Sequence, residues 1–208
     1  DNKMDPTLSY MLLLEDKMHQ ANLEITKQNF QNYGKRLELF KGVNEWFSRI
    51  KQYGKINNVE IEHYIISSGL TNMIEGCAFN GQIDRIYACE YIFKNGRGHW
   101  PKLSVNYSNK VQFIYRIHKG AFEVHDQDGV NQKKYFGDHI HVPFENMIFF
   151  GDGETDVPTF NVLNKNNGKS VCVYEDKNQK SIDIANKLFS DGRVHHLVKN
   201  DYTENSEI

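Results

Sequence analysis

An acidic glycine loop that follows a short apolar run constrains the fold of this chain more than any other stretch. Residues 147–158 read MIFFGDGETDVP. The four apolar residues predict a buried strand, Gly151 and Gly153 predict a tight turn, and Pro158 is tolerated in the first turn of a new helix. This order is typical of α/β sheets, which bind ligands at the carboxyl ends of their strands.

The carboxylates of this loop predict a metal site. Asp152, Glu154 and Asp156 lie close together in the sequence, and burying uncompensated carboxylates is unfavourable. Mg²⁺ would compensate them, because it takes one or two carboxylates together with phosphate oxygens and waters. The spacing of the carboxylates therefore suits Mg²⁺. The loop residues alone leave a second interpretation open, in which the acids only complement the dipole of the following helix.

Composition narrows the class of protein. The 208 residues suffice for one medium domain with a small insertion, and 11 Tyr and 13 Phe can fill its core. A formal net charge of −2 gives no support for nucleic-acid binding. The cysteines Cys77, Cys89 and Cys172 form no CxxC pair and predict a cytoplasmic protein without disulfides. No apolar run approaches the roughly 18 residues of a membrane span, so we expect no membrane partner.

The N-terminal quarter of the chain is predicted to be helical. Asp5 and Pro6 form a good helix start for residues 6–19, and a polar stretch follows. A second helix is predicted from an apolar stripe closed by Gly54. Its apolar positions are Phe40, Val43, Phe47 and Ile50. Residues 1–55 would thus form a small helical segment.

From residue 59 onward, predicted strands alternate with predicted helices. This alternation favours an α/β fold with a mostly parallel sheet and helices on both faces. The predicted strands are 59–66, 85–89, 147–150, 170–174 and 194–198, with a hairpin between 90–93 and 103–105. Residues 124–141 are predicted to be irregular.

Two further groups in this part can contact an anion. Ser67, Ser68 and Gly69 form a small-residue loop after a strand, which offers a hydroxyl and backbone N–H groups; Ser67 or Ser68 could instead only cap a helix. Lys110 lies in the first turn of a predicted helix, where a cation opposes the helix dipole. That position strengthens the case for a functional ammonium, although an exposed lysine is the commoner explanation of such a residue.

The hydroxyl, the ammonium and the acid cluster follow one another in a fixed order. The carboxyl ends of parallel strands meet at one edge of a sheet, so Ser67, Lys110 and Asp152 could converge there. A hydroxyl, an ammonium and a bound divalent cation are what a phosphoryl group needs for charge stabilisation.

At this point the sequence resembles the haloacid dehalogenase-like (HAD-like) superfamily of phosphohydrolases, in the branch similar to phosphoserine phosphatase. Residues 65–69, the Lys110 helix start and residues 151–156 are similar to the second, third and fourth motifs of that family. The resemblance covers residues 59–174, and the strand and hairpin within 83–105 fit the same branch.

The resemblance implies a role for each matching residue. Ser67 would hydrogen-bond a phosphate oxygen in a substrate-binding loop shared with Ser68 and Gly69. Lys110 would neutralise the phosphoryl group and the nucleophile. Asp152 would ligate Mg²⁺, and Asp156 would be a second ligand or support the first. Residues 1–55 would form a helical cap that chooses the substrate, and residues 56–208 a Rossmann-like α/β core.

One departure concerns the first motif of the family, a buried strand that ends in Asp-x-Asp. Its first Asp is the nucleophile that forms an aspartyl-phosphate, and its second is the general acid and base. No such strand precedes Asp5 in this sequence, and Asp1 and Asn2 are at most the end of that motif. We expect the nucleophile to lie in residues upstream of Asp1.

The predicted function is a Mg²⁺-dependent phosphatase that acts on a small phosphorylated metabolite through an aspartyl-phosphate. The alternative is a catalytically inactive HAD-like protein that binds a phosphorylated ligand or a protein partner. A Rossmann-type nucleotide binder is disfavoured, because the loop at Gly151 lacks a G-x-G-x-x-G motif and its acids would repel a pyrophosphate. The sequence does not indicate an oligomeric state.

Overall fold

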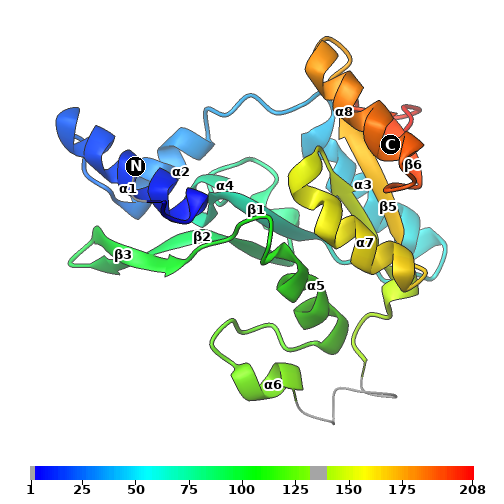
Figure 1. Cartoon of the computed structure of the whole chain (residues 1–208), viewed down its shortest axis with the longest axis horizontal. Coiled ribbons are helices and arrows are strands. Elements are labelled where there is room, and N and C mark those ends of the chain that lie inside the picture. The colour runs from blue at the N-terminus through cyan, green and yellow to red at the C-terminus, as the bar shows by residue number, and fades with distance from the viewer. Residues whose placement is uncertain (1–2, 132–139) are drawn as a thin grey trace. The chain divides into compact units, whose positions relative to one another are not determined.

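The computed structural model of the chain describes residues 3–131 and 140–208. The chain divides into two compact units (Figure 1). Unit 1 runs to Asn106 and includes Tyr202–Ser206, and unit 2 comprises Tyr107–Asp201 and Glu207–Ile208. This division differs from the boundary expected after residue 55, because the first helices pack in the same unit as the first strands.

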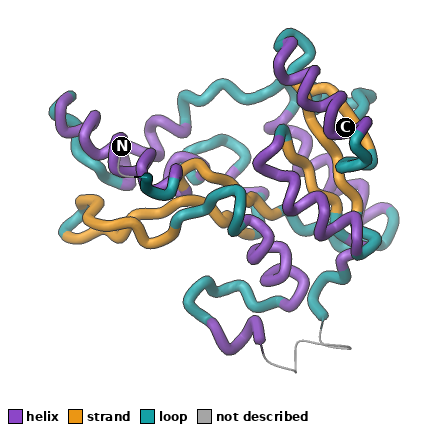
Figure 2. Tube along the Cα trace, in the orientation of Figure 1, coloured by secondary structure: helices purple, strands orange, loops and turns teal. Residues whose placement is uncertain are grey.

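Unit 1 contains a three-stranded sheet of order β1-β2-β3 with four helices. Strands β1 and β2 pair in parallel, and β2 and β3 form an antiparallel hairpin, visible as the long pair of strands in Figure 2. The elements are α1 (Pro6–Gln20), α2 (Lys27–Gly34), α3 (Val43–Ile56), β1 (Tyr64–Leu70), α4 (Thr71–Ile74), a 3₁₀ turn (Asn80–Gln82), β2 (Arg85–Lys94) and β3 (Arg97–Leu103).

The turn of the β2–β3 hairpin has the two-residue form that suits the twist of antiparallel strands. Asn95 and Gly96 both adopt positive φ, 52° and 80°, which is the backbone of the turn that Asn-Gly sequences favour. Lys94 and Arg97 are register partners on either side of it. A hairpin was predicted in this region and is present, but the position of its second strand was wrong, because β3 is Arg97–Leu103 and residues 103–105 were predicted.

Helix α1 begins where the sequence predicted and is held onto the strands of unit 1. The Asp5 carboxylate accepts from the backbone N–H of Thr7 and Leu8, both at 3.0 Å. The Tyr91 hydroxyl of β2 donates to the carbonyl of Met11 at 2.7 Å. The N-terminal helical residues therefore form one folded unit with β1–β3.

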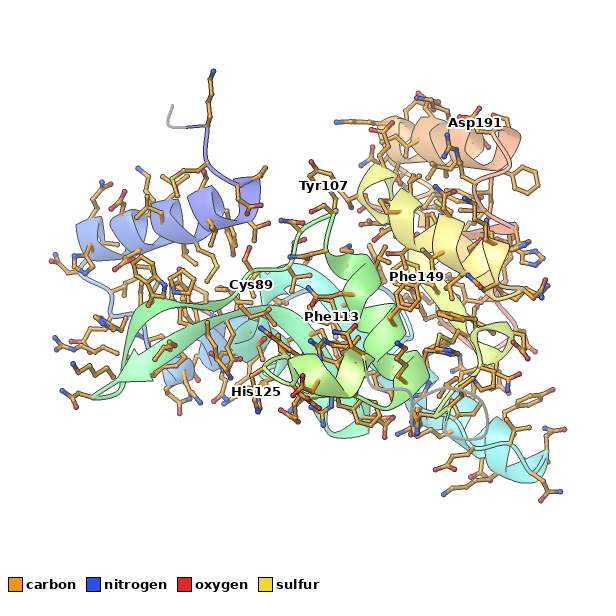
Figure 3. The ribbon with its side chains drawn as sticks, turned by 60° about the horizontal axis from the view of Figure 1, so that its bottom comes forward. Cys89, Tyr107, Phe113, His125, Phe149 and Asp191 are labelled. Atoms are coloured by element: carbon orange, nitrogen blue, oxygen red, sulfur yellow. The ribbon has the colours of Figure 1, made fainter. Side chains whose placement is uncertain are left out.

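Unit 2 contains a parallel sheet of order β4-β5-β6, which confirms the expectation of parallel pairing. Phe160 of α7 and Leu188 of α8 belong to its core together with Cys172 of β5. Phe149, labelled in Figure 3, packs edge-on against Phe160 with ring centroids 5.6 Å apart. The elements are α5 (Lys110–Lys119), α6 (Gln127–Asn131), a 3₁₀ turn (Phe144–Asn146), β4 (Ile148–Gly151), a 3₁₀ turn (Glu154–Asp156), α7 (Val157–Lys165), β5 (Lys169–Tyr174), α8 (Gln179–Ser190) and β6 (His196–Lys199).

Several local predictions were wrong for identifiable reasons. Ser67–Gly69 belong to β1 instead of a loop, although the register slips between Ser67 and Leu70. Gly54 does not end α3, which continues to Ile56. Glycine is needed at this position for space instead, because an added Cβ would lie 2.6 Å from the Val59 carbonyl oxygen. Helix α6 lies in the stretch predicted to be irregular, of which residues 132–139 are outside the described residues.

The apolar run before the acidic loop forms β4, but that strand is not fully buried. Ile148 is 61% exposed, and Phe149 and Phe150 are half-buried. Strand β4 pairs only with β5 among the described strands, so it lies at an edge of the sheet of unit 2. An edge position explains why an apolar run need not be buried on all sides.

Within the described part of the chain, no helix is both long and apolar enough to cross a membrane.

Candidate functional site

A buried ion pair lies at the start of helix α5. The Lys110 ammonium donates to Oδ1 of Asp156 at 2.6 Å, and the two side chains are only 10% and 3% exposed. The interpretation of Lys110 as an ordinary exposed lysine is therefore wrong. A buried ammonium at a helix N-terminus is unfavourable by itself, and the Asp156 carboxylate compensates it.

The second oxygen of Asp156 shapes the acidic loop. Oδ2 of Asp156 accepts from the backbone N–H of Asp152 at 3.1 Å. An added Cβ at Gly151 would lie 2.6 Å from this oxygen and 2.7 Å from the ring of Phe160. Gly151 is therefore required by close packing against the carboxylate. Gly153 has extended backbone, with φ −175°, and nothing within 4 Å of an added Cβ, so neither conformation nor space requires glycine there.

The Asp152 carboxyl lies in the negative electrostatic field of Asp156, which Lys110 offsets only in part. As a residue, Asp152 is exposed. Loss of hydration around its carboxyl and the nearby Asp156 charge raise its pKa, and the Lys110 ammonium offsets only part of this effect. Burial and the same two carboxylates raise the pKa of the Cys172 thiol to about 11. The loop therefore has a negative field that a further cation would stabilise.

The small residues at the end of β1 form a separate polar cluster in unit 1. The backbone N–H of Gly69 donates to Oγ of Ser67 at 3.0 Å, and Ser67 is half-buried. Ser68 is exposed, and the buried Cys89 thiol donates to its carbonyl at 3.4 Å. The structure thus brings Lys110, Asp152 and Asp156 together within unit 2, and Ser67, Ser68 and Gly69 within unit 1.

A solved structure resembles this arrangement of elements. The crystal structure of a HAD family hydrolase from Salmonella enterica subsp. enterica serovar Typhi matches with a TM-score of 0.53, over 84% of this chain and 47% of that one, at 16% sequence identity. The chain has a haloacid dehalogenase-like fold. At this identity the likeness concerns the fold alone.

The sequence comparisons add a relative but no family model. The chain is 28% identical over 200 residues to an uncharacterized protein of Borreliella burgdorferi, and the matched region covers 85% of this chain and 66% of that protein. No protein-family model matches. The chain therefore spans just under two thirds of this relative and about half of the structural neighbour.

The acidic loop of this HAD-like fold suits a divalent cation in part. Both oxygens of Asp156 are already bonded, to Lys110 and to the Asp152 N–H. Burial and the Asp156 charge raise the pKa of the Asp152 carboxyl, which also hydrogen-bonds Asp156, and it would have to be ionised to ligate a cation. Over residues 3–131 and 140–208, no group of three or more His, Cys, Asp or Glu side chains gathers as a metal site would require. One carboxylate with waters and phosphate oxygens is nevertheless a set that Mg²⁺ accepts.

Two contributors to the site could not be found in the sequence. Gly151 looked like a turn residue, whereas its role is to leave room for Asp156. Cys172 is the register partner of Gly151 across β4 and β5, and its apolar sequence context indicated only burial. The role of Gly151 depends on how the loop folds back over it, and the place of Cys172 depends on the pairing of β4 with β5, and the sequence of a single strand contains no signal for either.

Proposed function

We propose that this chain belongs to a Mg²⁺-dependent phosphohydrolase of the HAD-like type, a phosphatase that acts on a small phosphorylated metabolite. The observation that supports this most is the buried Lys110–Asp156 pair beside Asp152 in a haloacid dehalogenase-like fold. A structural ion pair needs no third acid, whereas a phosphoryl site needs a fixed ammonium next to a carboxylate that can ligate a cation.

In this proposal each residue has one task. Asp156 holds the Lys110 ammonium at the start of α5 and fixes the backbone of Asp152. Lys110 neutralises charge on the phosphoryl group, and Asp152 holds Mg²⁺. When bound, Mg²⁺ would supply Lewis-acid stabilisation of phosphoryl oxygens. Ser67, Ser68 and Gly69 lie at the end of β1 in unit 1, and their contribution of a hydroxyl and backbone groups to a phosphate oxygen is part of the proposal.

The proposed nucleophile is an aspartate upstream of Asp1. Such an aspartate would attack phosphorus, form an aspartyl-phosphate and release the alcohol, and water would then hydrolyse the intermediate. Strands β1 and β4 each have one neighbour among the described strands. A strand that precedes α1 could add to the edge of either sheet, and the relative and the structural neighbour are both longer than this chain.

The test is hydrolysis of p-nitrophenyl phosphate by full-length protein that includes the upstream residues. We expect turnover that requires Mg²⁺, and an Asp152→Asn rate lower by a factor of roughly 10²–10³, the effect of removing one electrostatic group from a reacting centre. Asp183→Asn is the matched control, because Asp183 lies exposed on α8 and contacts only Gln179 among the hydrogen bonds found.

Two results would contradict the proposal. One is equal turnover in Asp152→Asn and Asp183→Asn. The other is no turnover of the aryl phosphate or of a panel of phosphorylated metabolites by a folded full-length protein. Phosphate-ester binding without turnover would support the inactive HAD-like protein that the sequence left open.

A further inference from the structure

The outward face of the β2–β3 hairpin has an exposed aromatic and apolar pair. Ile92 and Trp100 are register partners, so their side chains lie on the same face. Trp100 is 67% exposed and Ile92 is 47% exposed. An exposed tryptophan beside an exposed isoleucine on a strand pair is unusual for a surface without a binding role.

Two cationic residues lie nearer the turn than Ile92 and Trp100, on the same face of the hairpin. Strand alternation places Lys94 on the face of Ile92, and Arg97 is the register partner of Lys94. The turn region has an open depression of about 410 Å³. It is lined by Lys94, Asn95, Arg97, Gly98 and His99. Cations and hydrogen-bond donors thus surround a hollow next to the exposed tryptophan.

These cations are available to a ligand. Within the described parts of the chain, the side chains of Lys94 and His99 have no ion pair or hydrogen bond. Arg97 pairs with Glu24, but the two side chains are 71% and 55% exposed, and such surface pairs are weak. Lys102 pairs with Glu90 at 2.8 Å, away from the depression.

The charge of the hairpin differs from that of the chain. The paired residues of the hairpin, 90–103, contain three cationic residues, Lys94, Arg97 and Lys102, against one acid, Glu90, whereas the whole chain has a net charge of −2. An anion would therefore be attracted to this hairpin more than to the surface as a whole.

We propose that the hairpin binds a nucleotide, with its phosphates in the depression at the turn and its base on Trp100 and Ile92. On β2, Lys94 lies two positions from Ile92, about 7 Å at the rise of a strand; on β3, a register shift between the two pairs leaves Arg97 three positions from Trp100. A nucleotide spans that separation through its sugar. Lys94, Arg97 and His99 donate to phosphate oxygens, and the indole of Trp100 stacks on the base.

Other occupants fit the hairpin less well. A membrane would require an apolar tip, whereas the residues of the turn, Lys94, Asn95, Gly96 and Arg97, are polar or charged. A nucleic-acid strand is bound by several aromatic platforms along a basic groove, and this face has one exposed tryptophan. A depression of about 410 Å³ lies in the range of small-molecule sites.

Tryptophan fluorescence of the chain tests the proposal directly. The chain has two tryptophans, and Trp46 is 8% exposed, so a surface ligand changes mainly the emission of Trp100. ATP is titrated in EDTA, which prevents metal-dependent turnover and separates this test from that of the proposed phosphatase. We expect saturable quenching with half-saturation below about 1 mM, and at least about tenfold weaker binding of adenosine and of pyrophosphate.

Variants separate the two halves of the site. Lys94→Gln should weaken ATP binding about tenfold, whereas the matched control Lys102→Gln should not change it. Trp100→Ala should weaken binding of a fluorescent ATP analogue, and Trp100→Phe should restore most of it, because a flat ring is retained.

Any of four results would overturn the proposal. The first is the absence of quenching by ATP, and the second is an equal change in ATP affinity for Lys94→Gln and Lys102→Gln. The third is pyrophosphate binding as tightly as ATP, and the fourth is a clear preference for another occupant. That preference would appear as a single-stranded oligonucleotide binding far more tightly than ATP, or as anionic phosphatidylglycerol vesicles shifting Trp100 emission while ATP has no effect.

Discussion

Replacing Lys110 by methionine should strongly destabilise unit 2. Methionine keeps a long flexible side chain but removes the ammonium that lies 2.6 Å from Asp156. The Asp156 side chain is 3% exposed, so its charge would remain buried without a partner. Breaking a buried pair in this way costs about 3–5 kcal/mol.

That loss is large relative to the stability of a chain of this size. Native proteins are stable by about 5–15 kcal/mol, and for chains of this length each kcal/mol shifts the midpoint of thermal unfolding by about 2–4 °C. Lys110→Met should therefore lower Tm by roughly 6–20 °C. Far-UV circular dichroism is the suitable assay, because Trp46 and Trp100 both lie in unit 1 and their fluorescence would not follow unit 2.

The same loop provides a matched control. Lys187 and Glu154 form an ion pair at 3.6 Å in which both side chains are 67% exposed. Lys187→Met should change stability by less than about 0.5 kcal/mol. If Lys110→Met destabilises the protein no more than Lys187→Met does, the argument from an uncompensated buried charge is refuted.

A double mutant tests whether the stability lost in Lys110→Met comes from the contact between Lys110 and Asp156. Asn at position 156 is neutral and can still accept from the Asp152 N–H, which Asp156 accepts in the structure. Lys110→Met combined with Asp156→Asn should therefore lose less stability than the sum of the two single changes. Simple additivity would mean that the two side chains do not interact.

Two further predictions concern packing and pH. Gly151→Ala should cost about 1–3 kcal/mol in urea unfolding, because the new methyl group meets Asp156 and Phe160, whereas Gly153→Ala should be nearly neutral. His63 is 8% exposed and lies beside Trp46. Burial, and to a smaller extent the nearby Lys51 charge, lower the pKa of His63 in the folded protein. The unfolded chain therefore binds more protons, and the free energy of unfolding should fall as pH drops below about 6.5. Urea unfolding of unit 1 followed by Trp46 fluorescence should show this loss, and His63→Leu should reduce its pH dependence; an unchanged dependence would assign the effect to other groups.

Much of the secondary structure was predictable because its signals are local. The Asp5 cap, the Asn95–Gly96 turn and the strand–turn–helix order around Gly151 each depend on neighbouring residues, and the structure has all three. Helix α2 was missed because its sequence is polar and lacks an apolar stripe. Its Gly34 packs so closely on α4 that an added Cβ would lie 1.9 Å from the Met73 carbonyl, which is a tertiary cause.

The small residues after the predicted first strand illustrate the opposite limit. Ser67, Ser68 and Gly69 have the local preferences of a loop, but pairing with β2 extends the strand through them. Backbone hydrogen bonds to a neighbouring strand outweigh such preferences, and no pattern within these three residues reveals that neighbour.

The sequence by itself determined which groups are available, namely acids after a short apolar run, a lysine at a helix start and small residues after a strand. Only the tertiary structure decided that Lys110 pairs with Asp156 across 46 positions, that burial and the Asp156 charge raise the pKa of Asp152, and that Gly151 leaves room for a carboxylate. Local preferences act between residues near one another in the chain, whereas charge compensation and close packing depend on distances that exist only once the chain has folded.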